Sequence, residues 1–141
     1  MIKRTPAPAR LVAALVVTGA ALAPGFAAAE VLVGEPQPFV GKDYDIRGDW
    51  SVVEEDGRTI IRFDDDFGTK AGPDLKVFLS PTSIGSVDGG SATDGSVLLG
   101  ALESTKGTQD YVLPEGVELA DFESVLVHCE TFSVLWGGGA L

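Results

Sequence analysis

Cysteine, histidine and methionine are almost missing from this chain of 141 residues, which contains one of each. Because Cys129 is the only cysteine, no intrachain disulfide can form. A blue-copper centre needs two histidines beside a cysteine, covalent haem needs a C-x-x-C-H sequence, and an iron–sulfur cluster needs several cysteines. The chain can therefore hold none of these groups by itself. A Ser–His–Asp triad could use only His128, and no G-x-S-x-G sequence accompanies it.

Positive charge is also scarce. Ten lysine and arginine residues stand against 21 aspartate and glutamate residues, a formal net charge of −11. Three of the ten basic residues and none of the acidic ones precede Glu30, so the chain from Glu30 onward carries seven basic and 21 acidic residues, a net charge of −14. Nucleic acids and anionic lipid surfaces attract positively charged proteins. We therefore expect no nucleic-acid partner, whereas a basic protein partner or a bound cation fits this charge.

Residues 1–29 have the three parts of a secretory signal. A basic leader precedes the uncharged apolar residues 11–23, and Ala27-Ala28-Ala29 then offers a small-x-small cleavage site before Glu30. The alternative, an uncleaved membrane anchor, is disfavoured because Pro24 interrupts an alanine-rich run, whereas a span needs about 20 strongly apolar residues. We expect a periplasmic or secreted protein that does not insert into the membrane once the signal has been cleaved.

The rest of the chain, residues 30–141, is predicted to be one all-β domain. Short β-rich runs alternate with clusters of glycine, proline, aspartate and serine, and helical periodicity is nearly absent. This pattern favours an antiparallel β-sandwich or a partly closed barrel of about seven or more short strands. The expected strands are residues 46–53, 59–63, 75–79, 97–102, 109–113, 124–129 and 132–136, with a hairpin turn at Asp56-Gly57, a surface loop at 85–96 and a helical turn within 117–123.

The densest acidic feature is Asp64-Asp65-Asp66, followed by Asp74. These carboxylates could supply oxygen ligands for calcium, which gives a calcium-stabilised β-domain as one hypothesis. The run lacks the D-x-D-x-D-G spacing that directs alternate side chains to one ion. We therefore predict no metal site, and we interpret these residues as turn carboxylates that accept hydrogen bonds from backbone amides.

The aromatic residues are expected to lie in the core or at its rim. Tyr111 shares a predicted strand face with Gln109 and Leu113, so we expect its ring to be buried with its hydroxyl hydrogen-bonded near the rim. Trp50 and Trp136 are interpreted as core or rim aromatics. The alternative, a platform on which a sugar ring stacks, has no further support in the sequence.

His128 and Cys129 are adjacent, but strand geometry argues against a catalytic pair. Neighbouring residues in a regular strand point to opposite faces, so a Cys–His dyad would need a bulge. Cys129 shares an apolar face with Val125 and Val127, which predicts an inward-facing, shielded and poorly reactive thiol. A zinc site that combines His128, Cys129 and carboxylates has no supporting spacing.

Several motifs occur in the same order as in a known domain family. They are Gly48-Asp49-Trp50, residues 63–67, Gly72-Pro73-Asp74-Leu75, Gly107-x-Gln109-x-Tyr111-x-Leu113-Pro114, and Ser124-Val125-x-Val127-x-Cys129-x-x-Phe132. Over roughly residues 35–141 the chain resembles the DM-thirteen domain, also called the electron-transfer DM domain. One departure is His128, because an aromatic residue commonly precedes the cysteine in that family.

The resemblance implies an exported β-rich domain with a redox role centred on Cys129, acting as a thiol or as a ligand to a prosthetic group. Some family members are fused to DOMON and cytochrome b-type modules, which implies a membrane cytochrome or another redox protein as partner. No particular cofactor follows from the sequence. The alternative is a non-enzymatic extracellular binding or adhesion module with a structural, buried Cys129. The sequence contains no self-contained catalytic constellation, so a redox or binding module is favoured over a hydrolase.

Overall fold

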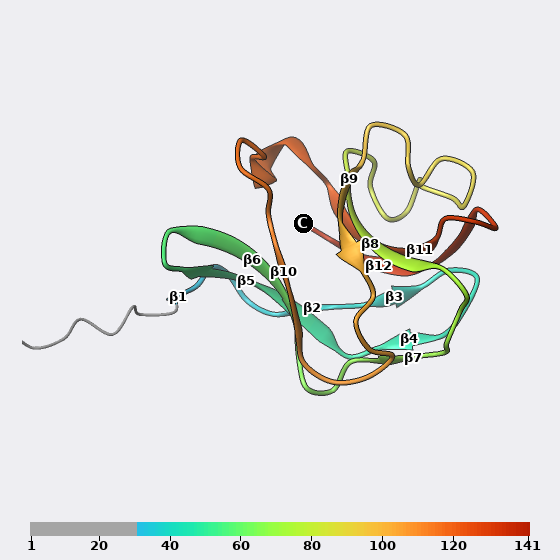
Figure 1. Cartoon of the computed structure of the whole chain (residues 1–141), viewed down its shortest axis with the longest axis horizontal. Helices are drawn as coiled ribbons and strands as arrows, with labels where there is room; N and C mark the ends of the chain where they lie inside the picture. Colours follow the sequence, from blue (N-terminus) through green and yellow to red (C-terminus); the bar gives the residue numbers. More distant parts are fainter. Residues whose placement is uncertain (1–30) are drawn as a thin grey trace, which may run out of the picture.

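Short antiparallel strands account for nearly all the regular structure (Figure 1). The computed structural model describes residues 31–141, and the secretory signal predicted for residues 1–29 lies outside them. The first sheet contains β1 (Val31–Leu32), β2 (Gln37–Pro38), β5 (Asp49–Glu55), β6 (Arg58–Phe63) and β10 (Gln109–Val112). The second sheet has the order β3 (Val40–Gly41), β12 (Val134–Ala140), β11 (Ser124–Cys129), β8 (Leu75–Ser80) and β9 (Val97–Ala101). β4 (Ile46–Arg47) and β7 (Gly68–Thr69) form a separate pair.

The two larger sheets pack against each other as a sandwich. One core cluster contains residues of both, including Trp50, Ile61 and Phe63 from the first sheet and Val77 and Val125 from the second. The all-β prediction is therefore confirmed, and the sandwich is the form it takes. In the described residues the helical turn expected within 117–123 is the 3-10 turn η1 (Leu119–Asp121). No helix in this part of the chain is long and apolar enough to cross a membrane.

The predicted hairpin joins β5 and β6. Asp56 and Gly57 connect the paired residues Glu55 and Arg58, and their φ angles are 51° and 72°. A two-residue hairpin turn needs positive φ at both positions, which Asp-Gly tolerates and most other pairs do not. The sequence signal and the local geometry therefore agree.

Two predicted strands differ from the structure by more than one residue at an end. The run 46–53 is divided at Gly48, whose φ is 90° and where a Cβ would lie 2.6 Å from the Phe67 backbone, so the chain bends between β4 and β5. The run 132–136 begins later and continues through Gly137–Gly139 to Ala140. Glycine weakens isolated strands, but here it allows close packing: a Cβ on Gly139 would lie 2.0 Å from Nε1 of Trp50.

The loop expected at 85–96 does more than lie on the surface. Val87 and Ala92 are buried in a second core cluster with Phe78, Leu126 and Leu135. These last three residues come from β8, β11 and β12, on the face opposite the main core. The loop therefore covers the outer face of the second sheet. The polar composition of residues 85–96 gave no indication of this role.

Candidate functional site

Cys129 is the last residue of β11 and lies between two neighbouring strands. Its partner on β8 is Leu75, and its partner on β12 is Val134. The residue is 1% exposed and belongs to the main core cluster, together with Val125 and Val127. The inward-facing, shielded free thiol predicted from the alternation in this strand is therefore what the structure has. Its surroundings are apolar.

His128 lies on the other side of the same sheet. Its ring packs edge-to-face against Phe78, with centroids 6.0 Å apart, and its Nε2 lies 2.9 Å from the carbonyl oxygen of Gly89. The tautomer with hydrogen on Nε2 can donate to that carbonyl, and Nδ1 then has no hydrogen-bond partner among residues 31–141. A register shift does occur beside His128, but it leaves Cys129 and His128 on opposite faces. The two residues form no dyad.

Polar contacts hold the turn that follows Cys129. The Asp74 carboxylate accepts hydrogen bonds from the Thr131 amide at 3.0 Å and from its hydroxyl at 2.6 Å. The Thr131 hydroxyl is the main reason that the pKa of Asp74 is lowered. Lys76 pairs with Glu130 and lies 3.4 Å from Asp74, and the Glu130 contact raises the pKa of Lys76. These contacts tie the turn after β11 to β8 and to the residue before it, and so hold the end of β11 where Cys129 lies.

One cavity is lined by a residue that neighbours Cys129 on β8. It has a volume of about 330 Å³ and lies between residues 71–75 and 101–105. Leu75 lines this cavity and is the cross-strand partner of Cys129. Directly opposite residues in an antiparallel pair have Cβ atoms about 5 Å apart. The Leu75 side chain therefore lies beside Cys129 and also borders the cavity, whereas Cys129 itself is not among the residues that line it.

A stacked aromatic pair leads from the core to the surface. Trp136 belongs to the same core cluster as Cys129, and its Nε1–H donates to the Lys70 carbonyl at 3.0 Å. Tyr44 is 40% exposed and stacks on Trp136 with a centroid distance of 4.0 Å and an interplanar angle of 27°. The core position expected for Trp136 is confirmed. Tyr44 was not singled out from the sequence, where it lies among charged residues without an apolar pattern.

The other aromatic predictions are confirmed. Tyr111 is buried, its hydroxyl donates to Gln109 at 2.6 Å, and it accepts from the Glu103 amide at 3.1 Å. Burial raises the pKa of Tyr111 to about 12. Trp50 is buried in the core, so its ring offers no exposed platform for a sugar.

The acidic residues bond to separate parts of the structure. Asp66 accepts from the Asp49 amide at 3.0 Å, and Asp64 accepts from the Ser51 hydroxyl at 3.3 Å. Burial is the main cause of the raised pKa of Asp64. Together with Asp74, these side chains serve as hydrogen-bond acceptors at turns. Within residues 31–141, no three histidine, cysteine, aspartate or glutamate side chains are grouped to hold a metal ion.

Comparison with known families gives one result that covers this site. The model of the family described as "Electron transfer DM13" matches residues 38–140, a segment that includes Cys129 and the strands on both sides of it. Comparisons with curated proteins and with solved structures give no match.

Proposed function

Because the chain belongs to the Electron transfer DM13 family, we propose that it is an exported electron-transfer module in which Cys129 is the redox-active residue. The observation that supports this role is the position of the thiol, buried at a strand end in the core cluster that also contains Trp136. A shielded thiol is protected from chance oxidation, which follows exposure and thiolate character. Such a thiol would exchange electrons with a docked partner and not with small oxidants in solution.

The surroundings of Cys129 favour a thiol over a ligand to a prosthetic group carried by this chain. Leu75, Val134 and Val127 are its near neighbours along and across the strands, and none of them can coordinate a metal. Of the two potential ligands adjacent in sequence, His128 faces the second core cluster, and Glu130 pairs with Lys76. A prosthetic group carried by a partner would require the sulfur to be uncovered by movement of Leu75.

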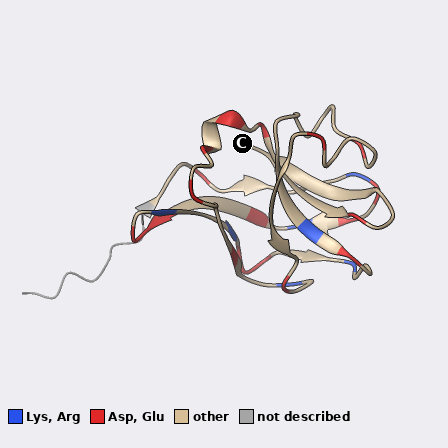
Figure 2. Cartoon of the chain, turned by 45° about the horizontal axis from the view of Figure 1, so that its top comes forward, with Lys and Arg blue, Asp and Glu red and all other residues tan. Residues whose placement is uncertain are grey.

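We place this module in the periplasm or outside the cell, with a membrane cytochrome or another redox protein as its partner. Acidic residues occur at many positions around the molecule, and basic ones are few (Figure 2). Complementary charge steers protein association, so the partner is expected to offer a basic docking surface and to bind less tightly as salt rises.

A second function is supported by the same burial. A cysteine that is 1% exposed and surrounded by apolar side chains also fits a structural residue in a non-enzymatic binding or adhesion module. The two functions differ in what happens when the sulfur is removed and the fold is retained.

The deciding experiment measures electron exchange with membranes from the native host. Cys129→Ser and Cys129→Ala should abolish the exchange, because both remove the thiol. Val127→Ala is the matched control: it truncates a buried residue on the same face of β11, leaves Cys129 in place and should retain the exchange. Full exchange by both cysteine variants would refute the redox function and establish the structural one. The visible spectrum and metal content of the protein purified from its native compartment would show whether any chromophore accompanies it.

A further inference from the structure

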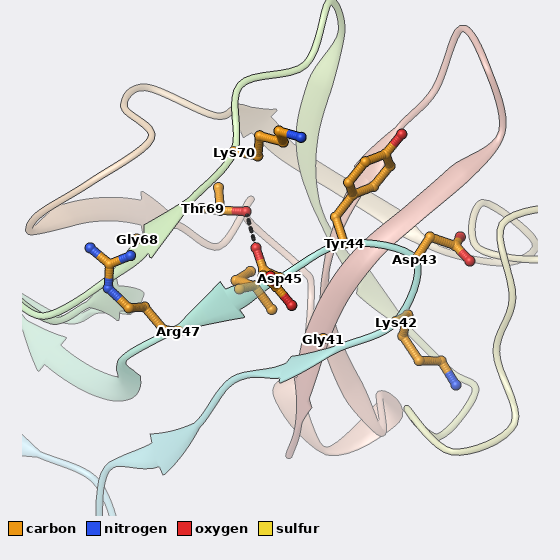
Figure 3. A pocket seen from close by; sticks show the side chains of 10 residues that line it. Gly41, Lys42, Asp43, Tyr44, Asp45, Arg47, Gly68, Thr69 and Lys70 are labelled. Atoms are coloured by element: carbon orange, nitrogen blue, oxygen red, sulfur yellow. Dashed lines mark hydrogen bonds between the residues drawn. The ribbon is translucent and has the colours of Figure 1, made fainter.

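A cavity distinct from the surroundings of Cys129 lies near the turn from β3 to β4. It has a volume of about 760 Å³ and lies between residues 41–47, around the turn from β3 to β4, and residues 68–70 of β7 (Figure 3). Its floor is the short β4–β7 pair, in which the Thr69 hydroxyl donates to the Asp45 carbonyl at 2.8 Å. The cavity is therefore built on paired backbone, not on a free loop alone.

The charge of this cavity differs from that of the whole chain. Residues 31–141 contain seven basic and 20 acidic residues, yet three of the seven, Lys42, Arg47 and Lys70, line this one cavity. Only Asp43 and Asp45 oppose them there, so the lining carries a net charge of +1. The carboxylate of Asp43 is already engaged, since it accepts from the Leu135 amide at 3.1 Å.

These three cations form no ion pair within the described part of the chain, whereas Arg62 and Lys76 do. The guanidinium of Arg47 lies beside Gly68, where an added Cβ would come within 2.6 Å of its Cζ (Figure 3). A guanidinium is suited to carboxylate, sulfonate and phosphate groups because its planar fork can donate two hydrogen bonds. The cavity therefore offers cationic donors to an anion.

An aromatic ring completes the lining. Tyr44 stacks on buried Trp136 through one face, so the orientation of its ring is fixed while 40% of the residue stays exposed. Tyr44 lines the same cavity as Lys70 and Arg47. A fixed aromatic ring beside unpaired cations is a combination that can hold a flat ring by stacking and its charged substituent by hydrogen bonds.

We propose that this cavity binds a planar aromatic anion, a ring system that bears a carboxylate, sulfonate or phosphate group. Arg47 and Lys70 supply the positive charge that attracts the anionic group, and Tyr44 stacks on the ring. The proposal goes beyond electron transfer by Cys129, because neither the thiol nor any electron exchange enters into it. A binding experiment therefore tests it separately.

The test is calorimetric titration of the purified protein with 2-naphthoate, with its neutral analogue 2-naphthamide and with inorganic phosphate. We expect 2-naphthoate to bind more tightly than the other two and to bind less tightly at high salt. The double variant Arg47→Gln/Lys70→Gln should weaken binding about tenfold or more, since it removes two of the three positive charges that line the cavity. Tyr44→Leu, which keeps an apolar cover over Trp136, should weaken binding about three- to tenfold.

Two further variants complete the test: Arg58→Gln is the control, and Gly68→Ala perturbs the cavity from the backbone side. Arg58→Gln removes one positive charge at the exposed β5–β6 turn, outside the cavity, and should change affinity less than about twofold. Gly68→Ala adds a methyl group where Arg47 lies and should weaken binding while the melting temperature stays nearly unchanged. No binding of 2-naphthoate, equal binding of 2-naphthamide or phosphate, or an equal loss in Arg58→Gln would each overturn the proposal.

Discussion

Leu75 and Cys129 are direct partners across the β8–β11 pair, and Leu75 also lines the cavity between residues 71–75 and 101–105. The leucine side chain therefore lies both beside the thiol and at the wall of that cavity. This relationship makes the accessibility of Cys129 a property that a single substitution can change.

Leu75→Ala is predicted to increase the labelling rate of Cys129 by a thiol reagent under native conditions by about tenfold or more, because the truncation opens the cavity towards the sulfur. The matched control is Leu79→Ala on the same strand and in the same core, whose partner on β11 is Val125. Each truncation should cost about 2–5 kcal/mol of stability. Equal labelling rates in the two variants would show that global loosening, and not the local route, exposes the thiol.

Cys129→Ser is predicted to fold and to lose about 1–2 kcal/mol of unfolding free energy, because a hydroxyl replaces a weakly polar thiol among apolar neighbours. Denaturant titration followed by tryptophan fluorescence measures this loss. In the parent protein, labelling of Cys129 should be slow when folded and rapid once unfolded. Rapid labelling of the folded protein would contradict the buried position of the sulfur.

Asp74→Asn is predicted to reduce the sensitivity of the fold to acid. The Thr131 hydroxyl lowers the pKa of Asp74 in the folded state, so the ionised carboxylate contributes stability above its unfolded pKa of about 3.9. That contribution is lost as the pH falls through the lower folded pKa. Stability measured from pH 6 down to pH 2 should decline less in Asp74→Asn than in the parent. Asp94→Asn, in the exposed loop, is the control and should follow the parent curve.

Tyr111 is predicted to ionise late in an alkaline titration. The chain has two tyrosines, and burial raises the pKa of Tyr111 to about 12. A folded pKa above the unfolded value of about 10 means that the group contributes stability below pH 10 and that this contribution is lost as the pH rises towards 12. Tyrosinate absorbance should therefore show one late step, absent from Tyr111→Phe. A single step involving both tyrosines near pH 10 would refute the burial.

The sequence predicts those elements whose local pattern and tertiary environment agree. Ser124–Cys129 has its predicted bounds because alternate residues face two different apolar clusters. The Asp56-Gly57 hairpin follows from backbone conformation alone. The inward position of Cys129 required only the alternation within its own strand. The secretory signal at 1–29 and the redox role of Cys129 stay predictions.

The features that sequence reasoning missed depend on contacts distant along the chain. The loop at 85–96 has a polar composition, and its buried Val87 and Ala92 become evident only when the outer face of β8 and β11 needs a cover. The cavity beside Tyr44 combines residues 41–47 with residues 68–70, which no local pattern links. The bend at Gly48 results from the close approach of Phe67.

The three glycines of β12 should make this segment intolerant of substitution. At Gly137, Gly138 and Gly139 an added Cβ would lie 2.4 Å from the Val40 carbonyl oxygen, 2.3 Å from the Val125 carbonyl oxygen and 2.0 Å from the Trp50 indole nitrogen. Every missense change at these three codons adds at least that carbon atom. A saturation library selected for folded protein should therefore be depleted of variants across this segment, although it contains no chemical group that binds or reacts.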